Sequence, residues 1–382
     1  MENKIQMVDL KGQYLKIKEE IDAAIFDVIN NTSFINGPAV GKFADHLSDY
    51  LGGIYTIPCA NGTDALQIAL MALDLKSGDE IIVPAFTYVA TAEVIGLLGL
   101  TPVMVDVDYD TFNVTIENIE KALSPKTKAI VPVHLFGQSC DMEPILNFAT
   151  KHNLYVIEDN AQAIGAEYTF SDGRKAKTGT MGTIGCTSFF PSKNLGCYGD
   201  GGAIFTKDEV LANKIKMIAN HGQEIKYHHK VIGCNSRLDT IQAAILDVKL
   251  NYLDNYSHHR YSAAQYYTRK LKQIDINEEL LILPKESNNS THVYHQYTLK
   301  VKNNHRDSLK KYLISKNIPC MVYYPLPLQE QEAFMQISKS LSSLNIAKEL
   351  AYSVLSLPIH TEISTSEIDY IVDTIAQYKS SF

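Results

Sequence analysis

One lysine stands in a setting that favours covalent chemistry. Lys193 lies in the segment Thr187–Gly196 (TSFFPSKNLG), directly after an apolar run and flanked by hydroxyl, proline and glycine residues. A half-buried lysine can have a lowered pKa and can form a Schiff base with a carbonyl compound. A lysine in an ordinary surface loop would show the same local pattern. The segment by itself leaves both interpretations open.

A second segment could bind phosphate. Asn61-Gly62-Thr63-Asp64 joins a predicted strand to a predicted helix. Gly62 would allow a ligand to approach the backbone closely, and the free N–H groups at a helix start favour an anion. The simpler alternative is a helix N-cap made by the Thr63 hydroxyl.

Two further strand ends carry polar or aromatic side chains. Thr87-Tyr88 follows one apolar run, and Glu158-Asp159 ends another, with Gln162 shortly afterwards. The Asp159 carboxylate could bind a metal, cap a following helix or hold a proton on a ring nitrogen, and capping is the simplest of the three. Ligands of open α/β sheets lie beyond the carboxyl ends of the strands. We therefore expect these strand ends to converge on one crevice.

Alternating apolar runs and helical patterns must position these groups. Strands are predicted at 55–60, 79–86, 102–106, 129–135, 155–158, 186–190 and 202–206, with helices at 63–73, 89–98, 116–123 and 144–152. Continuous Val and Ile runs between helices predict an α/β fold with a mainly parallel sheet.

The chain changes character after residue 207. Long helical patterns cover 209–220 and 239–272, and the second is too long for one compact helix without a bend. A small α+β unit is indicated by the segments 294–302, 306–316, 320–324, 346–354 and 367–378. We therefore expect two domains, 1–245 and 246–382.

Composition restricts the class of protein. The 382 residues are 45% hydrophobic and 20% charged, which excludes disordered and collagen-like chains. The net charge of −8 argues against a nucleic acid or an anionic membrane as partner. No uncharged run reaches the roughly 18 residues of a membrane helix, and the first six residues lack a signal-peptide core. Six scattered cysteines without a Cys-x-x-Cys pair favour a cytoplasmic location.

A phosphate cradle, an aromatic face, a carboxylate and a reactive lysine together are what pyridoxal phosphate needs. The motifs that carry them follow one another as NGTDAL (61–66), TYVAT (87–91), EDNAQA (158–163), SFFPSK (188–193) and NSR (235–237). In this order they resemble the DegT/DnrJ/StrS family of sugar aminotransferases, from residue 9 to nearly the C-terminus. The resemblance implies pyridoxal 5'-phosphate as cofactor. It also implies the aspartate aminotransferase type I fold, with a mainly parallel seven-stranded sheet, helices on both faces and a smaller C-terminal α+β domain.

The resemblance implies a role for each residue of these motifs. Lys193 matches the catalytic Schiff-base lysine, and Asp159 matches the catalytic aspartate paired with the pyridinium nitrogen, which keeps the ring protonated. The remaining cofactor contacts implied are Gly62, Thr63 and Ser188 at the phosphate, Tyr88 stacked on the ring, Gln162 near the phenolic oxygen and Asn235 at the phosphate of the neighbouring subunit. The match at Asn235 implies a homodimer with shared active sites.

Finer details are similar to one subgroup of the family. The stretches 59–67, 189–206, 221–223 and 227–229 resemble enzymes that aminate C3 of UDP-2-acetamido-2-deoxy-3-oxo-glucuronate. These enzymes use L-glutamate as donor and serve bacterial surface polysaccharide, such as lipopolysaccharide. Arg237 matches an arginine near the substrate, whose donors suit a carboxylate or a phosphate. Lys193-Asn194 differs from the Lys-Pro that is expected in this subgroup.

Three other segments bear on the substrate. His228 and His229 cannot both reach one ion from a regular helix, so we expect no metal and assign His229 to a basic patch near the sugar nucleotide. Tyr323 and Tyr324 either belong to the core or, as the resemblance implies, line the substrate channel. Gln329 stands where the family commonly has histidine.

Other functions compete with this one. Runner-up substrates are dTDP- or UDP-linked 3-keto or 4-keto deoxy sugars. Some relatives are dehydratases in which histidine replaces the lysine, and Lys193 argues against that activity here. A non-catalytic regulatory protein of the same fold would be expected to lose Asp159 or Lys193, and both are present.

Overall fold

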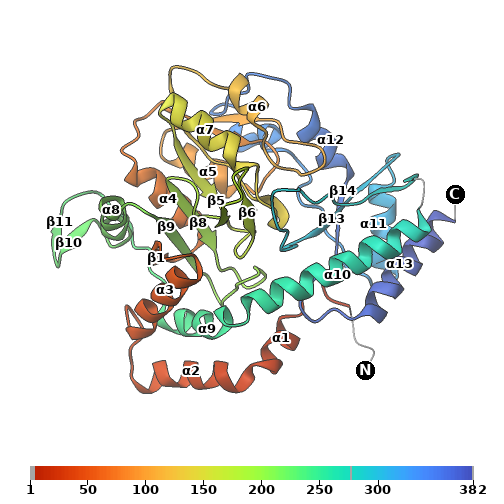
Figure 1. Cartoon of the computed structure of the whole chain (residues 1–382), viewed down its shortest axis with the longest axis horizontal. Coiled ribbons are helices and arrows are strands. Elements are labelled where there is room, and N and C mark those ends of the chain that lie inside the picture. The colour runs from red at the N-terminus through yellow and green to blue at the C-terminus, as the bar shows by residue number, and fades with distance from the viewer. Residues whose placement is uncertain (1–4, 276–277, 381–382) are drawn as a thin grey trace.

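A seven-stranded sheet forms the centre of the molecule in the computed structural model, which describes residues 5–275 and 278–380 (Figure 1). Its strands are β1 (Tyr55–Cys59), β2 (Glu80–Pro84), β3 (Thr101–Val105), β4 (Thr127–Ile130), β5 (Tyr155–Asp159), β8 (Ile184–Ser188) and β9 (Gly202–Thr206). The strand order is β1-β9-β8-β5-β4-β2-β3, and only β9 runs antiparallel to its neighbours. The prediction of a mainly parallel α/β sheet is confirmed.

Helices pack on both faces of this sheet. Those that follow its strands are α4 (Gly62–Ala72), α5 (Ala90–Leu97), α6 (Ile116–Lys121), α7 (Met142–His152) and α8 (Glu209–Ala219). Successive side chains of β9 point alternately to the two faces of the sheet. Ile204 belongs to the large core with α4 and α8, while Ala203 and Phe205 belong to a second core on the other side. The sheet is therefore buried on both faces, which explains why its strands read as continuous apolar runs.

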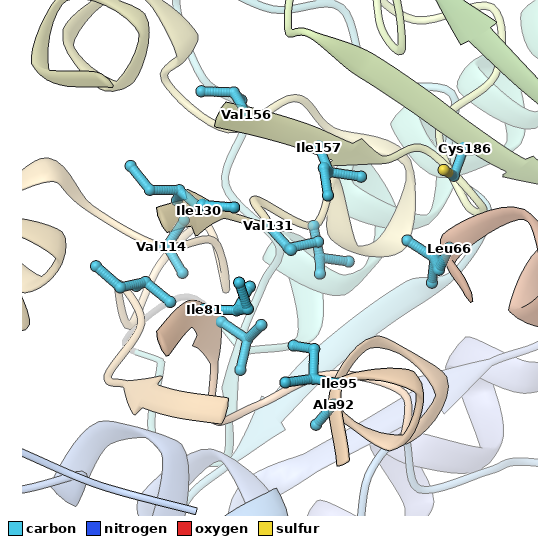
Figure 2. Packing of buried hydrophobic residues seen from close by; sticks show 14 of the residues in the cluster. Leu66, Ile81, Ala92, Ile95, Val114, Ile130, Val131, Val156, Ile157 and Cys186 are labelled. Atoms are coloured by element: carbon cyan, nitrogen blue, oxygen red, sulfur yellow. The ribbon is translucent and has the colours of Figure 1, made fainter. Parts of the chain in front are cut away.

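The large core fills the space between α4, α5 and the central strands. Figure 2 shows side chains of these helices, among them Leu66 and Ile95, gathered with Ile81, Ile130 and Ile157 of the strands. The apolar residues of α4 recur at helical spacing, as the sequence pattern predicts.

The long helical pattern after residue 239 forms two helices. They are α9 (Thr240–Leu250) and α10 (Leu253–Ile274), and the break at Asn251-Tyr252 confirms the expected bend. Three N-terminal helices come in addition to the predicted elements: α1 (Leu10–Lys16), α2 (Lys18–Asn30) and α3 (Pro38–Tyr50). Both α2 and α3 pack against α9.

The C-terminal part surrounds a small antiparallel sheet with a core of its own. Its elements are β12 (Leu281–Ile282), β13 (Tyr297–Val301), α11 (Arg306–Ser315), α12 (Asn345–Ser353), β14 (Val354–Leu357) and α13 (Thr365–Lys379). The segment 320–324 contributes a single bridge, between Met321 and Ser356, and β14 pairs with β13. The expected boundary after residue 245 falls inside α9, and the division into 1–245 and 246–382 stays a prediction.

Short elements complete the chain. They are β6 (Glu167–Thr169), β7 (Lys175–Lys177), β10 (Gln223–Ile225), β11 (His228–His229) and the 3-10 turns Leu135–Gly137, Leu328–Glu330 and Glu332–Phe334. Within residues 5–275 and 278–380, no helix is both long and apolar enough to cross a membrane.

Candidate active site

Several strand ends meet at one edge of the sheet. Gly202 at the start of β9 pairs with Cys59 at the end of β1 and with Ser188 at the end of β8. A cavity of about 450 Å³ opens there. The site residues from the sequence analysis that line it are Gly62, Thr63, Tyr88, Asp159, Gln162, Ser188, Lys193, Tyr323 and Tyr324. Residues separated by more than 250 positions in the chain thus share one cavity.

The start of α4 forms one wall of the cavity. Asn61 caps this helix, because its side-chain oxygen accepts a hydrogen bond from the backbone N–H of Asp64 at 2.8 Å. The expectation that Thr63 would be the cap is therefore wrong, since Asn61 occupies the extended N-cap position. Thr63 lies in the first turn of the helix and lines the cavity instead.

Gly62 makes this wall suitable for an anion. A Cβ atom at Gly62 would lie 2.7 Å from the Ser188 Cβ and 3.2 Å from its Cα. Glycine is therefore required for α4 and β8 to approach this closely. Gly62 and Thr63 stand in the first turn of α4 and line the cavity, and helix starts of this kind bind phosphate in many proteins.

Asp159 ends β5 with its side chain 5% exposed. One carboxylate oxygen accepts a hydrogen bond from the Thr91 hydroxyl at 2.7 Å, and the other accepts one from the Ala161 N–H at 3.1 Å. A turn and then β6 follow, so Asp159 caps no helix, contrary to the simplest expectation. No cluster of three or more metal-ligating side chains is found among the described residues. The arrangement suits a carboxylate that holds a protonated ring nitrogen.

The neighbouring Glu158 points into the protein and anchors the end of β5. Its fully buried carboxylate accepts hydrogen bonds from three backbone N–H groups, those of Gly179, Met181 and Gly182, at 2.6 to 2.8 Å. It also contacts His134 Nε2 at 2.9 Å. The sequence carries no signal for this network, because most of its donors are backbone groups in a loop twenty residues away.

Lys193 lies partly buried in the cavity wall. Its burial lowers the pKa of the amine to about 8, although the negative charge of Asp159 opposes this shift. Among the described residues, no group of the same chain forms a hydrogen bond with this amine. A lysine with this pKa is partly neutral near pH 7, as a nucleophile or a base must be.

Gln162 is held from two sides. Its side-chain oxygen accepts a hydrogen bond from the Phe136 N–H at 2.8 Å, and its nitrogen donates to the Tyr324 hydroxyl at 3.1 Å. One amide hydrogen remains for a ligand. Tyr88, 54% exposed, lies at the cavity mouth with its ring centre 6.1 Å from that of Tyr324.

Three predicted site residues lie outside this cavity. Asn235 forms a bridge with Asn220, and His229 is exposed on the hairpin β10–β11, which projects beyond α8 at the left of Figure 1. Arg237 forms no ion pair within the described part of the chain. Among the described lining residues, Lys193 alone is a lysine or arginine, while Asp159 and Asp200 are acidic.

The residues present fit pyridoxal phosphate. The Gly62 cradle would take the phosphate, Asp159 would face the ring nitrogen and Lys193 would reach the aldehyde. The hydroxyl of Thr87, which also lines the cavity, is buried and has no partner among the described residues. Such an unpaired buried group is expected where a polar ligand completes the site.

The chain is similar to known proteins over nearly its whole length. The chain is 46% identical to the UDP-2-acetamido-2-deoxy-3-oxo-D-glucuronate aminotransferase of Pseudomonas aeruginosa, over 96% of this chain and 98% of that protein. It is 44% identical to a pleiotropic regulatory protein of Geobacillus stearothermophilus, over 99% of each chain. It is 42% identical to the UDP-N-acetyl-3-dehydro-alpha-D-glucosamine 3-aminotransferase of Acidithiobacillus ferrooxidans, over 97% of each chain.

Solved structures share the whole fold. A DegT DnrJ EryC1 StrS aminotransferase from Brucella abortus superposes with a TM-score of 0.92 at 38% identity, covering 98% of this chain and 99% of that one. The ntda protein of Bacillus subtilis, solved with bound cofactor pmp, superposes with a TM-score of 0.86 at 31% identity, over 95% and 82% of the two chains. The model of one family matches residues 15–376. The chain therefore belongs to the DegT/DnrJ/EryC1/StrS aminotransferase family.

Proposed function

We propose that this protein is a pyridoxal-phosphate-dependent aminotransferase that moves the amino group of L-glutamate to C3 of a UDP-linked 3-oxo sugar. The substrate that we favour is UDP-2-acetamido-2-deoxy-3-oxo-glucuronate, for bacterial surface polysaccharide. The observation that carries the proposal is the presence of Lys193, Asp159 and the Gly62 cradle around one cavity. The relative from P. aeruginosa supports the choice of sugar.

Each of these residues has a separate task. When bound, pyridoxal phosphate supplies an electron sink for the carbanion that forms at the donor's α-carbon. Lys193 Nζ takes the proton from this carbon, since its pKa of about 8 leaves part of the amine neutral near pH 7. Asp159 holds a proton on the ring nitrogen through a carboxylate that Thr91 and Ala161 keep in place. The N–H groups at Gly62 and Thr63 hold the phosphate.

Catalysis is favoured over a purely regulatory role. One relative is named a pleiotropic regulatory protein, so sequence similarity alone does not separate the two functions. A binding protein has no need of a partly buried lysine in the same cavity as a buried carboxylate. Lys193 and Asp159 line one cavity, and the negative charge of Asp159 raises the pKa of the Lys193 amine against the effect of burial. This pair therefore supports turnover.

A homodimer with shared sites completes the binding pocket in this proposal. The cavity must hold a phosphate and an anionic sugar nucleotide. Among its described lining residues, Lys193 is the only lysine or arginine that could balance their charge. Asn235, Arg237 and His229 lie outside the cavity of their own chain, and exposed apolar side chains occur in the same stretch of sequence, namely Ile225, Tyr227 and Ile232. We propose that a second copy covers these side chains and receives Asn235 and Arg237 in its cavity.

Mixing two inactive variants tests this assembly. Lys193→Ala and Arg237→Ala would each abolish activity in their own homodimers. After unfolding and refolding as an equal mixture, roughly a quarter of the sites combine an intact lysine with an intact arginine, because half of the dimers are mixed. Recovery of about that fraction of the activity supports shared sites. A mixture that stays inactive, although mixed dimers form, contradicts them.

The substrate is tested by the product. The purified protein is incubated with pyridoxal phosphate, L-glutamate and one sugar nucleotide at a time, and mass spectrometry detects replacement of the oxo oxygen by an amine. The UDP-linked 3-oxo-glucuronate and its 3-oxo-glucosamine counterpart differ in the C6 carboxylate, so their comparison measures what that group contributes. We expect the uronate to have the higher kcat/KM. Preference for a dTDP-linked deoxy sugar would contradict the proposal.

The cellular compartment is also part of the proposal. All six cysteines are free thiols, and five of them are buried. Reduced thiols of this kind persist in the cytoplasm. We place the enzyme there.

A further inference from the structure

A histidine that the sequence motifs do not include lines the same cavity. His295 is 6% exposed, and its Nδ1 atom is buried without a hydrogen-bond partner among the described residues. It precedes β13 of the C-terminal part, about a hundred positions from Lys193. A buried polar side chain without a partner in a ligand cavity calls for an explanation.

The backbone around His295 is held firmly. Arg260, fully buried in α10, donates hydrogen bonds from one guanidinium nitrogen to the carbonyl oxygens of Tyr294 and Ile359, at 3.2 and 3.0 Å. Tyr294 has a φ of +42°, which a residue with a side chain adopts only when its surroundings impose it. The ring of His292 stacks on the Tyr294 ring with their centres 3.8 Å apart. These contacts fix the position from which His295 enters the cavity.

The segment 292–296 is also fastened to the lysine loop. Asn194, next to Lys193, donates a hydrogen bond from its side chain to the Val293 carbonyl at 2.9 Å. The Lys-Pro sequence expected in the subgroup could not make this contact. On the other side, the Val293 N–H donates to the Gly137 carbonyl at 2.9 Å. A Cβ at Gly137 would lie 2.9 Å from the backbone nitrogen of His295, so the turn and the segment are in close contact.

The charges near His295 keep its ring neutral. Burial, followed by the positive charges of Lys193 and Arg260, holds the pKa of His295 well below its usual range. Among the described residues, the charges that act on His295 are those of Lys193 and Arg260, whereas Asp159 acts on Lys193 from β5. The other titratable groups that line the cavity are Asp200, Tyr88, Tyr323 and Tyr324. A neutral imidazole has one nitrogen that accepts a hydrogen bond and one that donates.

From this placement we propose that His295 is a positioning residue for Lys193. In the aminotransferase cycle on which this inference rests, Lys193 must exist as a free amine for part of each turnover. No group of the described chain forms a hydrogen bond with that amine, and His295 lines the same cavity. An imidazole nitrogen therefore accepts a hydrogen bond from the released ammonium and holds it for the next proton transfer.

The proposal predicts in which direction the pKa of Lys193 changes when His295 is replaced. Burial already lowers the pKa of Lys193 to about 8. If a neutral acceptor stabilises the ammonium, His295→Phe removes that acceptor while the burial remains. The pKa of Lys193 should then fall by about one unit, a tenfold change in the protonation equilibrium. His295→Gln keeps an acceptor and should restore most of the difference.

The pKa is measured on the holoenzyme in its pyridoxamine-phosphate form, in which the Lys193 amine is free. Brief labelling with acetic anhydride at a series of pH values, followed by peptide mass spectrometry, gives the titration of this one amine. His258→Phe is the control, because it makes the same change at an exposed residue of α10 that does not line the cavity. We expect its Lys193 pKa to equal that of the wild type.

Each result decides the matter. A lowered pKa in His295→Phe, with recovery in His295→Gln and none of the change in His258→Phe, supports the inference. An unchanged or raised pKa in His295→Phe overturns it, as does an equal fall in the control. Borohydride reduction of the wild type separates the two proposals. If it attaches no cofactor to Lys193, both fall, whereas attachment together with an unchanged pKa in His295→Phe removes only the role of His295.

Discussion

Replacement of Gly62 by alanine is a sharp test of the phosphate cradle. The added methyl group would lie 2.7 Å from the Ser188 Cβ and 3.2 Å from its Cα. Neither atom is the end of a flexible side chain, so the start of α4 or the end of β8 must shift. Such overpacking costs about 1–3 kcal/mol. The shift separates the two elements whose close approach forms the cradle.

The expected change in cofactor affinity follows from this cost. If it falls entirely on cofactor binding, the Kd for pyridoxal phosphate rises roughly 5- to 150-fold. The assay is a titration of the cofactor-free protein, followed by absorbance, together with a thermal melt to measure any part of the cost that appears as lost stability. The loss of cofactor-binding free energy should be larger than any loss of stability seen in the thermal melt.

Gly41→Ala is the matched control. Gly41 lies in α3, is exposed, and has no atom within 4 Å of an added Cβ. Alanine in a helix interior should stabilise the protein by about 0.5–1 kcal/mol and leave the Kd unchanged. If Gly62→Ala bound the cofactor with the affinity of the wild type, the proposed phosphate cradle would be wrong.

Two further variants test other parts of the site. Asp159→Asn should lower kcat by about 100-fold or more while cofactor is still bound, because the ring nitrogen loses its carboxylate. Steady-state kinetics at measured cofactor content check this. Turnover at the wild-type rate would show that the carboxylate has no part in the chemistry. Lys249 is buried, and burial lowers the pKa of its amine to about 8 from 10.5. The unfolded chain therefore binds a proton between these pH values that the folded chain does not, so this group makes stability rise with pH across that window by up to about 3 kcal/mol. Lys249→Met should show a smaller rise than the wild type in urea unfolding at pH 8 and pH 10, and parallel curves for the two proteins would contradict the assignment.

The sheet could be predicted closely from the sequence because its strands are short, apolar and buried on both faces. The predicted strand at 155–158 forms β5 (Tyr155–Asp159), and the one at 202–206 forms β9 (Gly202–Thr206). Each is bounded by turns or helices, so the apolar run and the strand have nearly the same limits. The helix cap was harder to assign. Both Asn61 and Thr63 have side chains that can cap, and the extended backbone of Asn61 decides between them.

The groups around Lys193 could be predicted only in part. The lysine and Asp159 belong to motifs with local spacing, whereas His295 and Arg260 depend on contacts across the chain. Arg260 bonds to Ile359, which lies 99 positions away, and no periodic pattern signals such a pair. The positions of Asn235 and Arg237 have a different explanation, because in the proposed dimer they complete the cavity of a second chain.

The most direct test of the central claim is a visible absorption spectrum of the purified protein, recorded before and after the addition of L-glutamate. Borohydride reduction and peptide mapping of the same sample identify the residue that carries the cofactor. The account predicts a yellow protein whose band bleaches with glutamate and whose cofactor is attached to Lys193. A protein that shows no band even after added pyridoxal phosphate, or that carries the cofactor on another residue, would contradict it.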